Sequence, residues 1–129
     1  MRPHRTIAIG LIGLSTALIG GCIAVAVGAA AGIGTYAYVK GELSDTEEAT
    51  LDRAYEAALA AMKDLEFTVK EQSKDALHAR VVAAEADKTE VRIALESKSE
   101  KLTKLTVRVG VFGDEAQSRL IMDKIKKHL

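Results

Sequence analysis

The chain has 129 residues, of which 18 are Lys or Arg and 18 are Asp or Glu, so its formal net charge at pH 7 is zero. This balance gives no support to a nucleic-acid-binding function, which usually brings an excess of basic residues. The length suits one domain rather than two. A single cysteine cannot form a disulfide within the chain, so the core alone must stabilise the fold.

The N-terminal segment combines positive charge, an apolar run and the cysteine. Two arginines precede the apolar residues from Thr6 to Ile19, and Gly20, Gly21 and Cys22 follow. A short apolar segment behind positive charge, with small residues before the cut, is typical of a secretory signal peptide. Because Cys22 directly follows the two glycines, the segment resembles the lipobox of bacterial lipoproteins.

This resemblance implies cleavage between Gly21 and Cys22, which would make residues 1–21 a signal peptide. The Cys22 thiol would carry a diacylglycerol and its new amino group a further acyl chain, and two or more chains suffice for stable anchoring in a bilayer. The resemblance also implies sorting to the outer membrane, because Ile23 rather than Asp follows the cysteine. The alternative is that Cys22 is a small apolar residue in a transmembrane helix.

A second apolar stretch, rich in alanine and glycine, runs from Ile23 to Gly34. We expect residues 22–34 to form a lipidated, apolar tether that contacts the bilayer together with the acyl chains. The whole run from Thr6 to Val39 carries no charge and is long enough for two short helices. An uncleaved membrane hairpin bent at Gly20-Gly21 is therefore the alternative topology.

Residues 35–129 carry the pattern of a folded domain. A run of β-forming residues predicts a strand between Thr35 and Gly41. Ser44, with Glu47 three residues later, matches a capping box, and apolar residues then recur every three or four positions. The sequence therefore predicts a helix from Asp45 to about Leu65.

Alternation of apolar and polar residues predicts four further strands. They cover Phe67 to Gln72, Ala76 to Ala84, the stretch of Val91, Ile93 and Leu95, and Leu105 to Val111. The polar segments between them, including Ser97 to Lys101, have hairpin length, so the strands should form an antiparallel meander.

A second helix is expected at the C-terminal end of the sequence. Asp114 is placed as its N-cap, and an apolar stripe follows. The residues of this stripe are Ala116, Leu120, Ile121 and Ile125. Two amphipathic helices and one amphipathic sheet predict an α+β fold: a two-layer sandwich in which both helices cover one face of a mostly antiparallel sheet of about five strands. The expected order is strand, helix, four strands, helix.

The sequence predicts no catalytic or metal site, because no nucleophile, metal-ligand or phosphate-loop pattern occurs. We interpret Asp45, Glu47, Glu48 and Asp52 as the solvated start of the first helix. The alternation does predict a basic face on the side of the sheet away from the helices. Its residues are Lys70, His78, Arg80, Arg92, Lys104 and Arg108, with Glu96 as the main acidic residue.

This basic face has two interpretations. It could bind an anionic lipid headgroup or an acidic protein. It could equally be a solvated surface whose cations pair with neighbouring carboxylates, each pair contributing about 0–1 kcal/mol.

The lipobox, the Ala/Gly-rich segment, the Tyr36 to Leu43 strand and the Val111 to Ser118 run resemble a family of small proteobacterial lipoproteins classed as a domain of unknown function. The resemblance implies no activity. We expect a non-enzymatic structural or interaction protein of the envelope, anchored through Cys22, with its domain in the periplasm. Its expected partners are the bilayer and an envelope protein, without nucleic acid or cofactor. The alternatives are a ligand-binding module that uses the basic face, or an uncleaved inner-membrane protein.

Overall fold

A computed structural model describes residues 35–129. The expected signal peptide, Cys22 and the tether from Ile23 to Gly34 lie outside the described residues. So does the proposed membrane hairpin, except for its last five residues, of which Ala37–Val39 form a strand. The described elements are β1 (Ala37–Val39), β2 (Glu42–Glu47), α2 (Leu51–Asp64), β3 (Thr68–Lys74), β4 (His78–Ala84), β5 (Glu90–Ser99), β6 (Leu102–Val109) and α3 (Glu115–Lys126).

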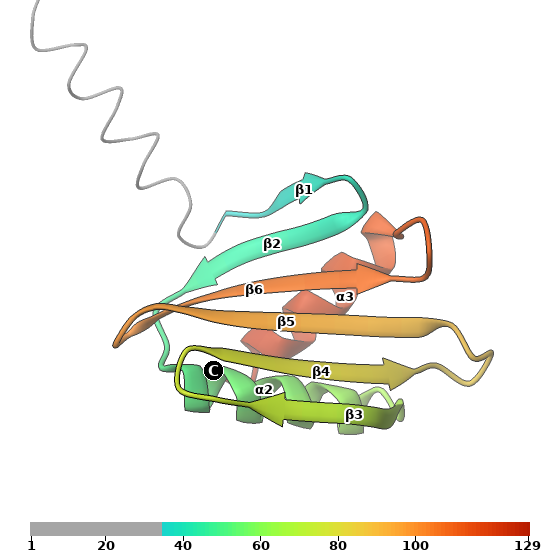
Figure 1. Ribbon diagram of the computed structural model, residues 1–129. Coiled ribbons are helices and arrows are strands. Elements are labelled where there is room, and N and C mark those ends of the chain that lie inside the picture. The colour runs from blue at the N-terminus through green and yellow to red at the C-terminus, as the bar shows by residue number, and fades with distance from the viewer. Residues whose placement is uncertain (1–34) are drawn as a thin grey trace, which may run out of the picture. The chain divides into compact units, whose positions relative to one another are not determined.

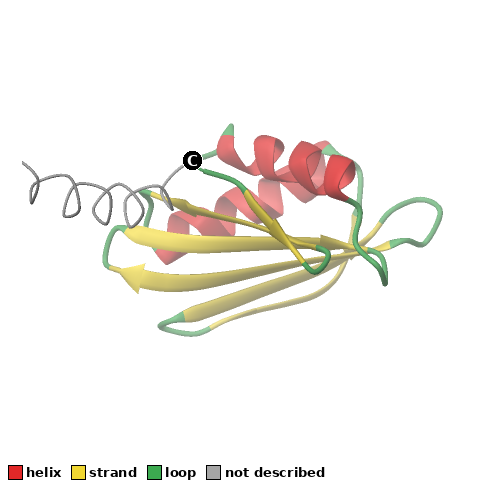
Figure 2. Cartoon of the chain, turned by 90° about the horizontal axis from the view of Figure 1, so that it is seen from above, coloured by secondary structure: helices red, strands yellow, loops and turns green. Residues whose placement is uncertain are grey.

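The six strands form one open sheet in the order β1-β2-β6-β5-β4-β3, and every neighbouring pair is antiparallel. Both helices lie on the same face of this sheet (Figures 1 and 2). Helix α2 packs mainly on β4 and β5, and α3 on β6 and β2. The structure thus confirms the α+β two-layer sandwich and adds a sixth strand.

The sixth strand is β2, and it corrects the expected start of the first helix. Lys40 and Gly41 both have positive φ, at 52° and 85°, and form a two-residue turn between β1 and β2. Such turns match the twist of a hairpin. The chain therefore returns as a strand that pairs with β6, with Leu43 opposite Val107. Asp45 lies on this strand and not on a helix.

Helix α2 begins instead at Leu51. Its N-cap is Thr50, whose side chain accepts a hydrogen bond from the amide of Arg53 at 3.2 Å. The capping-box prediction for Ser44 and Glu47 is wrong, because strand pairing with β6 already satisfies the backbone there.

The predicted meander is confirmed, with small shifts of the strand ends. Ala79, Val81 and Ala83 are buried as expected, whereas Leu77 precedes β4 and is 58% exposed. Val111 lies beyond the end of β6. The expected turn from Ser97 to Lys101 is shorter than predicted, because β5 continues to Ser99 and leaves only two residues for the turn.

The terminal helix begins as predicted. Asp114 is the N-cap of α3, and its carboxylate accepts a hydrogen bond from the amide of Gln117 at 3.0 Å. Ile121 and Ile125 are buried against the sheet together with Met122. The predicted stripe is wrong at Ala116 and Leu120, which are exposed.

Candidate functional site

The sheet face away from the helices carries the candidate residues. Ala79, Val81 and Ala83 of β4 are buried toward the helices, so the alternate residues His78 and Arg80 point to the other side. The same alternation places Arg92 of β5 and Lys104 and Arg108 of β6 on this face. Lys70 reaches it from edge strand β3, where a β-bulge lies between Val69 and Glu71. We call this surface the open face.

Strand register arranges the open face in rows. One row crosses the sheet from Glu71 through Val82, Arg92 and Arg108 to Glu42. The next row consists of Ser73, Arg80, Ala94, Thr106 and Ser44. A third row joins His78, Glu96, Lys104 and Thr46. Apart from Arg80, the charged residues of these rows thus lie in the outer two, and small residues occupy the rest of the row between them.

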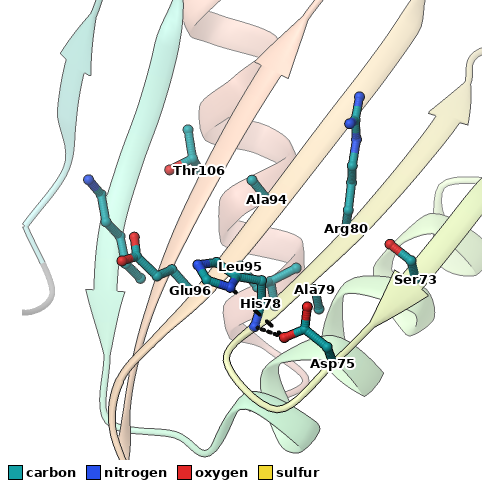
Figure 3. A pocket seen from close by; sticks show the side chains of 10 residues that line it. Ser73, Asp75, His78, Ala79, Arg80, Ala94, Leu95, Glu96 and Thr106 are labelled. Atoms are coloured by element: carbon teal, nitrogen blue, oxygen red, sulfur yellow. Dashed lines mark hydrogen bonds and ion pairs between the residues drawn. The ribbon is translucent and has the colours of Figure 1, made fainter.

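Small side chains in the middle row leave a hollow of about 300 Å³. Ala94 and Thr106 lie on its floor, while Arg80 rises at one end and His78 and Glu96 lie at the other (Figure 3). A second hollow, of about 290 Å³, shares Arg80, Ala94 and Thr106 and extends toward Arg92 and Arg108. Arg80 therefore borders both hollows.

The cations of the open face differ in their partners. Arg92 Nε lies 2.5 Å from Glu90 Oε1, and Lys70 Nζ lies 3.9 Å from Glu90 Oε2, so one carboxylate serves both. Arg80 forms no ion pair with any residue in the described part of the chain. Lys104 has no ion pair there either, but it lines only the first hollow, whereas Arg80 borders both. Arg80 is thus the cation best placed to accept an anionic group at the two hollows.

Arg108 has a structural task besides its place on this face. Its guanidinium donates hydrogen bonds to the backbone oxygens of Lys40, at 3.1 Å, and of Val111. Glu42 Oε1 lies 3.8 Å away. Arg108 therefore joins two turns, and its removal would change more than the charge of the face.

The other end of the hollow carries two carboxylates, with Lys104 beside Glu96. Backbone amides of Leu77 and His78 donate to Asp75 at 2.8 Å, and these hydrogen bonds lower the pKa of Asp75. A hydrogen bond from Lys98 lowers the pKa of Glu96. Both carboxylates are therefore held ionised, and the hollow presents negative charge near His78 and positive charge at Arg80 (Figure 3).

A buried charge cluster that the sequence patterns did not predict lies between β2 and α3. Lys126 Nζ contacts Asp45 Oδ2 and lies 2.9 Å from Glu47 Oε1. The Asp45 side chain is fully buried, and neither contacting oxygen has another hydrogen-bond partner in the structure. The expectation that Asp45 and Glu47 start a solvated helix is thus wrong. Alternation through Asp45, Thr46 and Glu47 was the signal for an inward-facing pair.

Tyr36 extends this cluster. Its hydroxyl donates to Asp123, and its ring lies beneath both Lys126 and Arg119. Burial, with the hydrogen bond to Asp123 adding to it, raises the pKa of Tyr36 to about 12. The cluster joins the first described residues to the last helix, so we assign it to stability.

The described residues contain no group of three metal-binding side chains, and no helix among residues 35–129 is long and apolar enough to cross a membrane. A comparison with curated proteins finds no match. A family of proteins of unknown function, DUF3568, matches residues 5–128. The match covers nearly the whole chain, including Cys22 and every residue of the open face. The chain therefore belongs to the DUF3568 family.

Proposed function

We propose that the protein is a lipid-anchored lipoprotein of the bacterial envelope, and that it holds a non-enzymatic interaction domain close to the bilayer. The observation that carries this proposal is the position of Cys22, directly after an apolar run and two glycines. The family match supports it, because the shared region begins at residue 5 and includes that segment.

The length of the tether sets where the domain acts. Thirteen residue steps separate Cys22 from Thr35, the first described residue, and a fully extended chain of that length spans about 45 Å. A tether whose apolar residues lie in the bilayer would be shorter still. The domain's partners are therefore bilayer lipids or proteins within this distance of the membrane.

Labelling with palmitate tests the anchor. We expect the wild-type protein to incorporate label, to lose residues 1–21 and to fractionate with the outer membrane. Cys22→Ser should incorporate none, whereas the control Gly32→Ala, which leaves the lipobox intact, should label normally. Wild-type protein that takes no label and keeps residues 1–21 would contradict the proposal, and in the membrane fraction it would favour the uncleaved hairpin.

A second candidate function is the binding of an anionic group at the open face. Arg80 favours it, because this cation borders two hollows and lacks an ion pair among the described residues. The buried apolar core lies wholly between Leu43 and Ile125, so a fragment of residues 35–129 should fold. Its NMR spectrum reports the binding of inorganic phosphate or a soluble phospholipid.

We expect phosphate-dependent shifts of the Arg80, Ala94 and Thr106 amides, which Arg80→Gln removes and Lys101→Gln preserves. Lys101 is an exposed control in the β5–β6 turn. A response to the phospholipid alone would indicate a lipid headgroup as the source of the anion. Equal responses of both variants would exclude a site at Arg80.

A further inference from the structure

Two turns meet at one end of the sheet, and glycines form the contact between them. A Cβ on Gly113 would lie 2.4 Å from the Cα of Gly41, and a Cβ on Gly41 would lie 2.7 Å from the backbone oxygen of Phe112. Both glycines also have positive φ. The β1–β2 turn and the β6–α3 turn thus pack backbone against backbone, at a distance that no side chain permits.

Arg108 holds the same two turns from the open face. Its guanidinium donates to the Lys40 oxygen in one turn and to the Val111 oxygen in the other. The glycine contact and the bridging guanidinium together fix the two turns relative to each other. The backbone of the residues between these contacts, Val111 and Phe112 among them, is therefore held in place.

The junction presents apolar side chains to solvent. Phe112 is 91% exposed, Val111 79% and Val39 63%, and they are the three most exposed large apolar residues of the described chain. Lys40, also exposed, lies beside them. Exposed apolar residues that gather in one place often mark an interaction site. We call Val39, Lys40, Val111 and Phe112 the apolar tip.

We propose that the apolar tip inserts into the interface of the bilayer that carries the protein's own lipid anchor. This inference rests on the proposed anchoring at Cys22. Thr35, where the tether enters the domain, precedes Val39 by four residues, so the two lie within about 14 Å of each other. A tether that spans up to about 45 Å therefore leaves the tip within reach of the bilayer that holds the anchor.

The charges near the tip indicate which force drives insertion. Lys40 and Arg108 are offset by Glu42 and by Asp114, so the tip has no excess of positive charge. Burial of Phe112, Val111 and Val39 supplies the attraction, and Lys40 can reach the headgroups with its long stem. We therefore expect insertion to persist in high salt and in neutral lipid.

Fluorescence of a site-attached probe tests the inference on the full-length protein in phosphatidylcholine vesicles. Lipidation removes the Cys22 thiol, so Phe112→Cys provides a single labelling site for a polarity-sensitive fluorophore. Leu77→Cys is the matched control, because Leu77 is also apolar and exposed but lies at the opposite end of β4. Both substitutions leave the core unchanged.

We expect the probe at residue 112 to shift to the blue and to be quenched by spin-labelled lipid in low and high salt, and the probe at 77 to do neither. Water-like emission at 112 would overturn the inference. A blue shift without lipid quenching would also overturn the inference. It would indicate contact with a second copy of the chain if the shift depends on protein concentration, and contact with residues 23–34 if it does not.

Palmitate incorporation measured on the same sample separates the proposed anchor from the proposed insertion. Labelled protein with a solvated probe contradicts only the insertion, whereas unlabelled protein contradicts the anchor and the inference built on it.

Discussion

Lys126 Nζ lies 4.3 Å from the centroid of the Tyr36 ring, so a residue just before the first strand is held by the last turn of the last helix. Among the described residues, the same ammonium is the only cation in contact with the buried carboxylate of Asp45. Lys126 therefore holds the segment before β1 against α3 and also neutralises the buried charge of Asp45.

Lys126→Met should destabilise the domain strongly. The substitution keeps the stem but leaves Asp45 and Glu47 without a counter-charge. We expect a loss of about 2–3 kcal/mol, below the 3–5 kcal/mol of a fully buried pair because solvent reaches part of the lysine. Urea unfolding measures the loss. Lys124→Met, in the same turn but without an ion pair among the described residues, should change stability by less than about 0.5 kcal/mol. Equal effects of the two variants would disprove the role of the buried charges.

Alkaline pH should weaken the domain through the same cluster. Burial alone would lower the pKa of Lys126, but its contacts with Asp45 and Glu47 outweigh burial and raise it. The pKa of Tyr36 is raised from 10.0 to about 12. Both groups bind their protons more tightly in the folded state, so their contribution is complete below pH 10 and is lost as pH rises toward 12.

Unfolding free energy measured from pH 8 to pH 12 checks this dependence. We expect Tyr36→Phe to lose the part of the alkaline decline that comes from Tyr36. The variant should also show a smaller rise of the ultraviolet tyrosinate signal near pH 12 than the wild type, because only the other two tyrosines remain. A wild-type stability that stays level through this range would show that the cluster does not control the pH response.

Gly113→Ala should cost more stability than Gly110→Ala, although both residues have positive φ. Alanine strains the backbone at either position by roughly 1–2 kcal/mol. At Gly113 the new methyl also meets Gly41, whereas at Gly110 it meets only Thr89 Cγ2 at 3.8 Å. We expect an additional loss of about 1–3 kcal/mol at Gly113 from overpacking. Thermal unfolding of the pair measures the difference, and equal midpoints would rule out the tight contact.

Thr50→Ala should weaken helix α2, and Ser44→Ala should not. Thr50 caps the helix, and loss of such a cap costs about 1 kcal/mol. Ser44 lies on β2, with its hydroxyl 3.3 Å from that of Thr106. Urea unfolding distinguishes the two helix starts, because a larger loss at Ser44 would support the capping box that the sequence suggests.

Sequence patterns predicted the parts of this fold that follow one clear periodicity. Alternation placed Ile93 and Val107 in buried strands, and Asp114 marked the start of α3. The error at β2 arose because Ser44 and Glu47 satisfy a local capping pattern, while the strand is decided by pairing with β6, more than fifty residues away. Local signals could not reveal that partner.

The candidate site, like the fold, was predictable only where a local pattern decides the structure. Side-chain alternation placed Arg80 and Arg92 on one face, but it could not show that Glu90 pairs with Arg92 while Arg80 lacks an ion pair among the described residues. The buried contact of Asp45 with Lys126 also escaped prediction, since it joins elements that are distant in the sequence. The anchor at Cys22 stays a prediction.

The attachment of Tyr36 to α3 has a mechanical consequence. Strand β1 is short and, among the described strands, pairs only with β2. A pull on the chain before Thr35 would by itself peel β1 from the sheet edge, beginning at the Ala37–Ser44 pair. Tyr36 lies ahead of that pair and is fastened to Asp123 and Lys126. A force applied from the N-terminal side is thus transmitted first to helix α3. The hydrogen bonds between β1 and β2 carry that force only after the contacts of Tyr36 break.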